Sequence, residues 1–498
     1  MIELSTVIVG AGFSGLCAGI LLKREGIDSF VILDKGDRVG GTWRDNTYPG
    51  AACDVPSHLY SYSFEPNPSW SRSYGQQPEI LAYLERCVDR YGLAPHLRFH
   101  QKVERATWHD DTGTWHVTTG DGTTYAARTL VLGAGALHVP QVPKIPGLDR
   151  FRGRQFHSAR WDNDYDLRGK RVAVIGTGAS AIQFVPEIAP AVEHMQVFQR
   201  TPPWIVPKRD RLIGAREQWA YEHIPGAHWL RRASEYWRLE WHVVGFAYAP
   251  KVNELLEKIV LRYLASQVRD RELRAKLTPQ YRFGCKRVLI SNDYYPTLQR
   301  PNVELVTDPI EAIEPSGVRT ATGVHAVDAV IFGTGFSVTE HLSAIDIVGR
   351  GGVRLDDAWK SSMRNYLGIT VSGFPNLFML LGPNTGLGHN SSVFMIEAQT
   401  RYAVRAIHTI LARDVRAMDV RPAVEAAFRA ELAQRMKNTV WMTGCSSWYQ
   451  TPDGEVFLWP AASLDYWRRT RRLDLTDYDL TIVARHERTP VADALAAS

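Results

Sequence analysis

The sequence predicts an α/β protein that repeats one unit: a strand, a glycine-rich turn, a helix and a second strand. Three observations predict this fold class. Glycine-rich turns follow short apolar strands at residues 10–15 and again at 176–181, and residues 204–280 carry long helical patterns with few strand signals. Two α/β domains with a helical insertion are therefore expected.

The order of the elements supports this division. In the first unit we predict a strand, a helix and a strand at residues 6–9, 16–23 and 30–34, and in the second unit two strands at 171–175 and 195–199. Further strands are predicted at 303–306, 329–332 and within 374–384, and a long helix at 252–268. The stretch 133–149 is rich in Gly and Pro, cannot propagate a helix, and is interpreted as a crossover between domains. The predicted domains are 1–149 with 341–498, 150–203 with 281–340, and a helical insertion at 204–280.

Length and composition fit a globular protein of several domains. A chain of 498 residues is too long for one hydrophobic core, and its 45% hydrophobic and 22% charged residues are ordinary values. The formal net charge of +5 is too small to indicate nucleic-acid binding. Neither a signal peptide nor an apolar run long enough to span a bilayer is present, so we expect a cytoplasmic protein.

The cysteines point away from several kinds of site. They are odd in number, scattered and never spaced as CxxC: Cys17, Cys53, Cys87, Cys285 and Cys445. This pattern argues against a disulfide framework, a zinc site and a dithiol reductase, and fits a reducing compartment.

The first glycine-rich turn has the spacing of a dinucleotide-binding motif. Gly10, Gly12 and Gly15 stand between a strand and a helix, where glycines permit a tight turn, backbone approach to a pyrophosphate and close helix–strand packing. The helix N-terminus then faces the phosphate charge. Asp34 ends the next strand, where a carboxylate can bind ribose hydroxyls. The turn predicts an FAD-type site.

The second turn repeats the motif with a different partner. Gly176, Gly178 and Ala181 have the same context, but Arg200 ends the following strand and Thr201 comes next. A cation there suits the ribose 2′-phosphate and favours NADPH over NADH. The alternative is a surface arginine beside a proline turn.

Together the two sites predict hydride transfer from NADPH to FAD. A CxxC pair that could pass electrons to a disulfide is absent from the sequence, as is a Cys-rich run for an iron–sulfur cluster. Molecular oxygen is therefore the expected acceptor.

A third motif lies just ahead of the second unit. Phe151, Gly153, His157, Trp161 and Asp162 match the pattern F-x-G-x-x-x-H-x-x-x-W-P/D throughout. The chain in this respect resembles the type I Baeyer–Villiger monooxygenases, which are class B flavin monooxygenases. We expect His157 and Trp161 to govern how the two domains move, without a chemical role.

Other segments extend the resemblance over most of the chain. Residues 40–54, with Gly41, Thr42 and Trp43, are similar to the family's flavin-contacting segment, and residues 199–202 to its NADPH 2′-phosphate segment. Residues 284–287 and 293–295 are similar to the segment that bears the catalytic arginine.

The resemblance implies a function and roles for particular residues. The family forms a C4a-peroxyflavin that attacks a small-molecule ketone, and a tetrahedral (Criegee) adduct then rearranges to an ester or lactone. Arg287 would stabilise these anions, Asp54 would hold Arg287, and Lys286 would join Arg200 and Thr201 on the 2′-phosphate.

Each role has a plainer alternative. Lys286 and Arg287 could form a solvated basic pair, and Asp54 could be a turn residue. The Trp-rich insertion could be an amphipathic membrane surface, although a packed helical cap over the substrate is the favoured interpretation. The family's familiar lid segment has no clear counterpart: Trp441, Gly444, Cys445, Trp448 and Tyr449 stand in its place.

Two other functions remain open. A heteroatom monooxygenase would oxidise amines or sulfides with the protonated hydroperoxide. A flavoprotein that binds NADPH could also serve as a redox sensor or an uncoupled oxidase. The ketone, its regiochemistry and the oligomeric state do not follow from the sequence.

Overall fold

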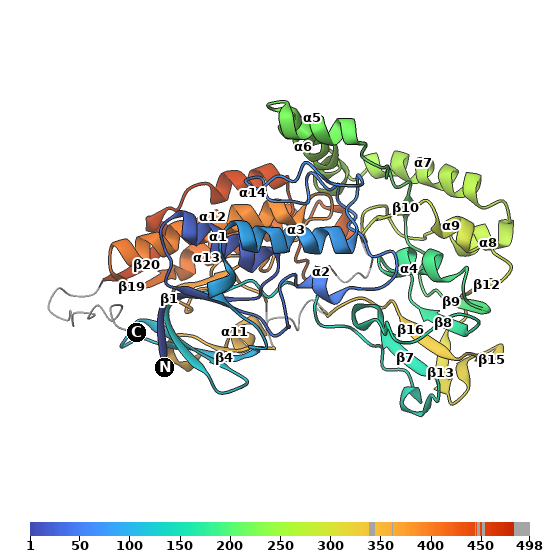
Figure 1. The fold of residues 1–498 in the computed structure, drawn as a ribbon, viewed down its shortest axis with the longest axis horizontal. Helices are drawn as coiled ribbons and strands as arrows, with labels where there is room; N and C mark the ends of the chain where they lie inside the picture. Colours follow the sequence, from blue (N-terminus) through green and yellow to red (C-terminus); the bar gives the residue numbers. More distant parts are fainter. Residues whose placement is uncertain (338–343, 361, 444, 446–448, 451–453, 483–498) are drawn as a thin grey trace.

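A computed structural model describes the chain except for residues 338–343, 361, 444, 446–448, 451–453 and 483–498. Two sheets with their covering helices form two adjoining lobes, and α5 and α6 stand at the outer margin of the molecule (Figure 1). The predicted α/β class is confirmed. Among the described helices, none has the length and apolar character needed to cross a bilayer.

The first sheet has the order β17-β4-β5-β6-β1-β2-β3, and β18 also pairs with β6. Its strands are β1 (Ile2–Val9), β2 (Phe30–Leu33), β3 (Leu97–Arg98), β4 (Val103–His109), β5 (Thr114–Thr119), β6 (Thr124–Leu132), β17 (Asp346–Val348) and β18 (Leu377–Met379). β1 is parallel to both β2 and β6, whereas β4, β5 and β6 form an antiparallel meander. Strands from both ends of the chain therefore share one sheet.

The largest hydrophobic core lies between this sheet and the helices that pack on it. The elements are α1 (Phe13–Arg24), α2 (Thr42–Asp45), α3 (Gln77–Arg90), α11 (Leu355–Trp359), α12 (Ser392–Ala412), α13 (Pro422–Met436) and α14 (Ser463–Thr470). α1 and α12 are apolar along most of their length and pack against each other. An antiparallel pair, β19 (Val415–Val420) with β20 (Tyr478–Ile482), lies beyond them.

The second sheet is entirely parallel, with the order β12-β9-β8-β16-β7. Its elements are β7 (Arg154–His157), β8 (Arg171–Ile175), β9 (His194–Phe198), β12 (Val303–Val306), β16 (Ala329–Phe332), α4 (Ala181–Ile188) and α9 (Tyr294–Thr297). A meander of β13 (Ile310–Glu314), β14 (Gly317–Thr320) and β15 (Gly323–Ala326) flanks it. Strands β8, β9 and β16 are almost fully buried, as parallel strands covered on both faces must be.

Helices dominate the segment between β9 and β12. They are α5 (Ala215–His223), α6 (Ala227–Glu240), α7 (Val252–Gln267) and α8 (Arg271–Lys276), and a short parallel pair joins β10 (Ile205–Val206) to β11 (Leu289–Ile290). The predicted helix at 252–268 is therefore confirmed to within one residue.

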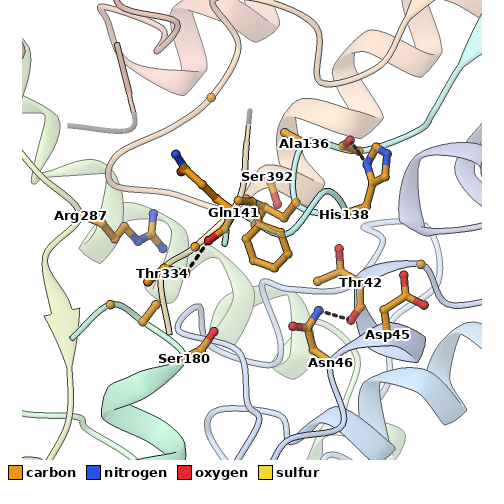
Figure 2. A pocket seen from close by; sticks show the side chains of 18 of the residues that line it. Thr42, Asp45, Asn46, Ala136, His138, Gln141, Ser180, Arg287, Thr334 and Ser392 are labelled. Atoms are coloured by element: carbon orange, nitrogen blue, oxygen red, sulfur yellow. Dashed lines mark hydrogen bonds between the residues drawn. The ribbon is translucent and has the colours of Figure 1, made fainter. Parts of the chain in front are cut away.

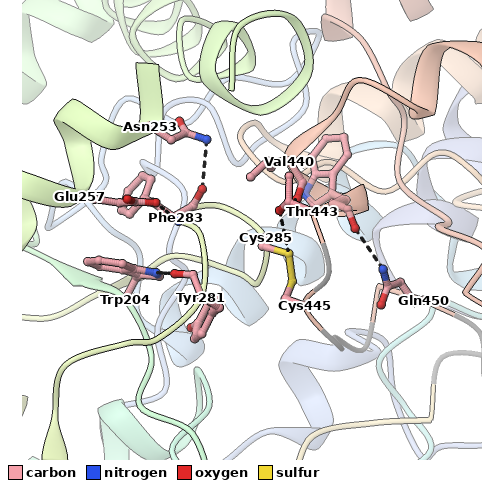
Figure 3. Close-up of a disulfide and its surroundings, with 11 residues drawn as sticks. Trp204, Asn253, Glu257, Tyr281, Phe283, Cys285, Val440, Thr443, Cys445 and Gln450 are labelled. Carbon is pink, nitrogen blue, oxygen red and sulfur yellow. Dashed lines mark hydrogen bonds between the residues drawn. A yellow bond between two sulfur atoms is a disulfide. The ribbon is translucent and has the colours of Figure 1, made fainter. Parts of the chain in front are cut away.

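One disulfide contradicts the expectation from cysteine spacing. Cys285 and Cys445 are bonded, with their Cα atoms 6.3 Å apart although 160 residues separate them (Figure 3). Spacing along the chain carries no information about such a pair, because only tertiary packing brings these two segments together. Cys17, Cys53 and Cys87 are free and buried.

Candidate active site

A cavity of about 1280 Å³ lies where the two sheets meet. Both glycine-rich turns line it, together with parts of residues 40–55, 198–203 and 281–289. Figure 2 shows Arg287 extending into this cavity from the side opposite His138. The space lies at the carboxyl ends of β1 and β8, the usual position of ligands in open α/β sheets.

The first turn cannot accept a side chain at Gly10 or Gly15. Gly10 has φ +98°, and a Cβ there would lie 2.5 Å from the carbonyl oxygen of Gly133. A Cβ on Gly15 would overlap the carbonyl oxygen of Gly10, while Gly12 packs against Gly41 across the cavity wall. The backbone is thus open to a pyrophosphate at the start of α1, which fits FAD.

Asp34 is held in position by the turn itself. Its Oδ2 accepts a hydrogen bond from the Ala11 N–H at 2.7 Å, and its Oδ1 accepts from the Gly36 N–H and from Arg44, each at 2.7 Å. Because Oδ2 accepts one bond here, it keeps capacity for a ribose hydroxyl. The pairing of Arg44 with Asp34 was not predicted; Arg44 lines the cavity and ties residues 42–45 to the ribose carboxylate.

The predicted flavin segment forms the adjacent wall. Gly41 has φ +53°, and Thr42 and Trp43 begin the short helix α2. The indole N–H of Trp43 donates to the Tyr60 hydroxyl at 3.2 Å, which fixes the ring at the edge of the cavity. All three residues line the space, as a flavin-contacting segment requires.

The second turn is built in the same way. Gly176 has φ +105°, and a Cβ there would lie 2.5 Å from the carbonyl oxygen of Gly333. Gly178 lines the cavity, whereas Ala181 is fully buried at the start of α4. A Cβ on Gly333 would come within 3.0 Å of the Ala181 methyl, so the small third residue permits close packing of the two segments.

Two cations gather beside this turn. Arg200, Thr201 and Lys286 all line the cavity. Burial lowers the pKa of Lys286, and the charge of Arg200 lowers it further. Arg200 and Lys286 repel each other, so an anion bound between them is stabilised. The 2′-phosphate of NADPH is such an anion.

Arg287 and Asp54 form the ion pair that the family resemblance implied. The Arg287 Nη2 and Nε donate to Asp54 Oδ2 at 2.6 and 3.0 Å, and Nη1 donates to the carbonyl oxygen of Leu387 at 3.3 Å. Burial alone lowers the pKa of Arg287, but the charge of Asp54 raises it above its ordinary value. The Arg287 side chain is 24% exposed and lines the cavity, so the alternative of a solvated basic pair does not hold.

Tyr449 is a cavity residue whose role sequence reasoning left unassigned. Its ring is buried next to Arg287, and burial raises the pKa of its hydroxyl to about 12, against the lowering effect of the arginine charge. Gly444 and Trp448, from the same segment, lie outside the described residues.

The fingerprint residues lie behind the cavity wall. None of the five is among the residues that line it. Phe151 and His157 are buried, and the His157 ring packs 5.8 Å from Phe336 on the returning crossover. Trp161 packs on Phe184 of α4 at 5.3 Å.

Two further fingerprint residues act locally. A Cβ on Gly153 would lie 2.4 Å from the carbonyl oxygen of Asp328, so this position needs glycine. Asp162 pairs with Arg154 on β7. These contacts support a positioning role for the fingerprint.

The helical insertion does not line the cavity. None of residues 204–280 is among its lining residues. The cap over the substrate stays a prediction. The Trp-rich composition reflects a set of tryptophans that remain exposed on α5 and α6.

Comparisons with known proteins agree with this site. The family described as pyridine nucleotide-disulphide oxidoreductase matches residues 7–213. A Baeyer–Villiger monooxygenase of Pseudomonas aeruginosa is 45% identical over 95% of this chain and 91% of its own. Among solved structures, cyclohexanone monooxygenase in its closed form superimposes with a TM-score of 0.88 at 30% identity, over 97% of this chain and 100% of that one.

A third comparison concerns the cofactors. The structure of OTEMO in complex with FAD and NADP has a TM-score of 0.88 at 28% identity and covers 96% of this chain and 99% of that one. The two glycine turns and the cation pair of this chain occupy one cavity that fits the same two cofactors. The chain therefore belongs to the Baeyer–Villiger monooxygenases, a family of FAD- and NADPH-dependent flavoprotein enzymes.

Proposed function

We propose that this enzyme inserts one oxygen atom beside the carbonyl of a small-molecule ketone to give an ester or lactone. The balanced reaction consumes the ketone, O2, NADPH and one proton, and gives the ester, NADP+ and water. Bound NADPH supplies the hydride, and bound FAD supplies the activation and transfer of oxygen. The observation that carries the proposal is a fixed guanidinium, Arg287, that faces the cavity shared by both nucleotide turns.

Arg287 stabilises negative charge on the reacting ketone. As the carbonyl carbon becomes tetrahedral, its oxygen gains charge that an aligned cation can stabilise by a few kcal/mol, roughly 3 in comparable oxyanion sites. The bonds to Asp54 and Leu387 use three of the five guanidinium N–H groups. With Tyr449 also bonded to Arg287, at least one N–H remains for the oxyanion, and Asp54 fixes its direction.

Asp54 acts as a positioning residue for Arg287. It lies on the flavin-contacting segment, whereas Arg287 follows the insertion, so the pair joins two distant parts of the chain. Because the carboxylate takes both Nε and Nη2, the guanidinium plane is fixed.

Arg200, Thr201 and Lys286 select NADPH. The mutual repulsion of the two cations is relieved when the 2′-phosphate binds between them, and NADH offers no such anion. Asp34 is assigned to the FAD ribose on the same geometric basis. A cytoplasmic location stays a prediction.

Product analysis tests the proposal. The purified yellow enzyme is given NADPH and 18O2 with cyclic, linear, aromatic and steroidal ketones, and with one thioether, at several pH values. We expect one labelled oxygen in an ester or lactone and nearly one product per NADPH for the preferred ketone. Brisk oxidation of the thioether without any ester would establish the heteroatom monooxygenase instead. Hydrogen peroxide as the sole product across the panel would establish the uncoupled oxidase.

A further inference from the structure

An exposed aromatic face lies on α6, outside the catalytic machinery. We define the tryptophan face as Trp229, Leu230, Trp237 and Trp241, whose side chains are 67, 63, 52 and 71% exposed. Most of the other tryptophans that the structure describes, such as Trp70, are buried. α6, which carries Trp229, Leu230 and Trp237 and is followed directly by Trp241, stands at the outer margin of the molecule (Figure 1). Four such side chains exposed together exceed the scattered apolar residues of an ordinary surface.

A groove of about 560 Å³ runs beside this face. α6 forms one wall with Trp229 and Trp237, and α12 and α14 form the other with Phe394 and Trp467. The groove shares no lining residue with the catalytic cavity. It is thus a separate apolar depression that adjoins exposed indoles.

Arginines surround the groove in excess over carboxylates. Arg232, Arg401, Arg405 and Arg471 line it, against the single carboxylate of Glu397. Glu397 already accepts a hydrogen bond from the Ser63 backbone N–H at 2.6 Å and lies 3.8 and 3.6 Å from Arg232 and Arg401.

The two outer arginines face solvent. Arg405 and Arg471 are exposed, and the Arg471 guanidinium lies 5.3 Å above the Trp467 ring. Their charges are therefore available to an anion that approaches the tryptophan face. Interfacial tryptophans beside arginines are the combination that binds membrane surfaces that contain anionic lipids.

We propose that the tryptophan face and its arginine-lined groove dock this enzyme on a bilayer surface of anionic phospholipid. The indoles insert at the level of the head groups, and Arg405 and Arg471 contact lipid phosphates. A second copy of the chain is a poorer occupant, because a two-fold contact at this face brings the same arginines opposite one another. Docking there leaves the catalytic cavity untouched and brings it close to ketones dissolved in the membrane.

Vesicle binding tests this proposal. The holoenzyme is sedimented with vesicles of phosphatidylcholine alone and of phosphatidylcholine with phosphatidylglycerol, at low and high salt. We expect binding only to the anionic vesicles and its loss at high salt. Replacing Arg405 and Arg471 by Gln should weaken binding by about five-fold each, since an arginine near an anionic surface contributes on the order of 1 kcal/mol. Trp229→Ser with Trp237→Ser should weaken it further at either salt concentration.

Matched controls isolate the face. Arg152→Gln and Val324→Ser alter exposed residues on the other lobe and should leave vesicle binding unchanged. All variants should oxidise NADPH in the absence of vesicles at the rate of the unaltered enzyme, which shows that they fold. Absence of binding to anionic vesicles at low salt overturns the proposal. So does a shift from dimer to monomer in the tryptophan variants, since that result assigns the face to a second copy.

Discussion

Arg287 is positively charged at the cavity because Asp54 offsets the cost of burying it. Removing a guanidinium from water is unfavourable, and the two bonds to one carboxylate oxygen, at 2.6 and 3.0 Å, make the buried charge stable. The same bonds fix the plane of the group. A residue that the sequence could place only by resemblance thus acquires a physical basis for its role.

We expect Arg287→Ala to separate flavin reduction from oxygen insertion. NADPH should still bleach the flavin, because the cation pair at the second turn is intact. Ester formation should fall by about 10²- to 10³-fold, as when one donor to an oxyanion is removed. Stopped-flow absorbance and product chromatography measure the two steps.

Arg282→Ala is the matched control for this variant. Arg282 belongs to the same loop but is exposed and pairs with Glu254, so its loss should change neither step. Near-normal ester formation by Arg287→Ala would show that the assignment of the arginine is wrong.

Arg200→Ala should reduce the preference for NADPH. A charged hydrogen bond contributes roughly 1.5 to 3 kcal/mol, so KM for NADPH should rise by about 10- to 100-fold. KM for NADH should change little, because NADH lacks the phosphate. Steady-state kinetics with both nucleotides give the ratio of the two KM values. An equal rise in KM for NADH would show that Arg200 does not bind the 2′-phosphate.

At the level of elements, the disulfide joins two segments that lie far apart in the sequence. Cys285 immediately precedes Lys286 and Arg287, and Cys445 lies four residues before Tyr449. Both cysteines pack in one apolar cluster with Trp204, Phe246 and Trp441. The bond therefore fixes the arginine loop against the wall that carries the tyrosine.

Cys445→Ser should lower the free energy of unfolding by about 2 to 4 kcal/mol under oxidising conditions. Urea unfolding followed by circular dichroism measures the change. A thiol reductant should bring the unaltered protein to the stability of the variant and leave the variant itself unaffected. Equal stability of both proteins without reductant, together with two free thiols by mass spectrometry, would show that the bond does not form.

Local signals explain which elements were predictable. β8, β12 and β16 have the predicted bounds, because each is a short run of apolar residues with a clear end. The strand expected within 374–384 is shorter, spanning Leu377–Met379. The meander of β4, β5 and β6 was not predicted. Buried and half-buried residues alternate along β5, and such a pattern forms a sheet only when the strands pair with one another and with β1.

At the scale of the whole molecule, two crossovers connect the lobes side by side. Pro140 and Phe336 form an antiparallel bridge, and the Gln141 N–H donates to the Gly335 carbonyl oxygen at 2.9 Å. Both crossovers line the cavity. A change in the angle between the lobes therefore alters the cavity directly. The fingerprint residues pack behind these crossovers, which agrees with the expectation that they govern lobe movement.

Gln183 of α4 makes the contact between the lobes that is best suited to a test. Its Oε1 accepts from the Tyr48 hydroxyl at 2.9 Å, and its Nε2 donates to the Ala52 carbonyl oxygen at 3.0 Å. Gln183→Ala should loosen the lobes and lower the yield of ester per NADPH by roughly two- to ten-fold, since two neutral hydrogen bonds contribute about 1 kcal/mol each. Peroxide and ester assays measure this yield.

Gln196→Ala provides the comparison, because Gln196 bonds only within the second lobe, to Glu304 and His325. Its yield of ester should be unchanged. An unaltered yield in Gln183→Ala would mean that this contact does not govern the closure of the lobes.

The sequence by itself predicted the two nucleotide turns. Gly10 and Gly176 each adopt a positive φ, and glycine is the residue that takes this backbone conformation without strain. The sequence also predicted a cation for a phosphate through Arg200 at the end of the following strand, whereas the fold brings Lys286 beside it. Only the tertiary structure decided that Cys285 bonds Cys445 and that Tyr449 adjoins Arg287. It alone showed that the tryptophans of α6 face outward. These facts depend on which distant segments pack together, and burial of apolar surface sets that choice for the chain as a whole.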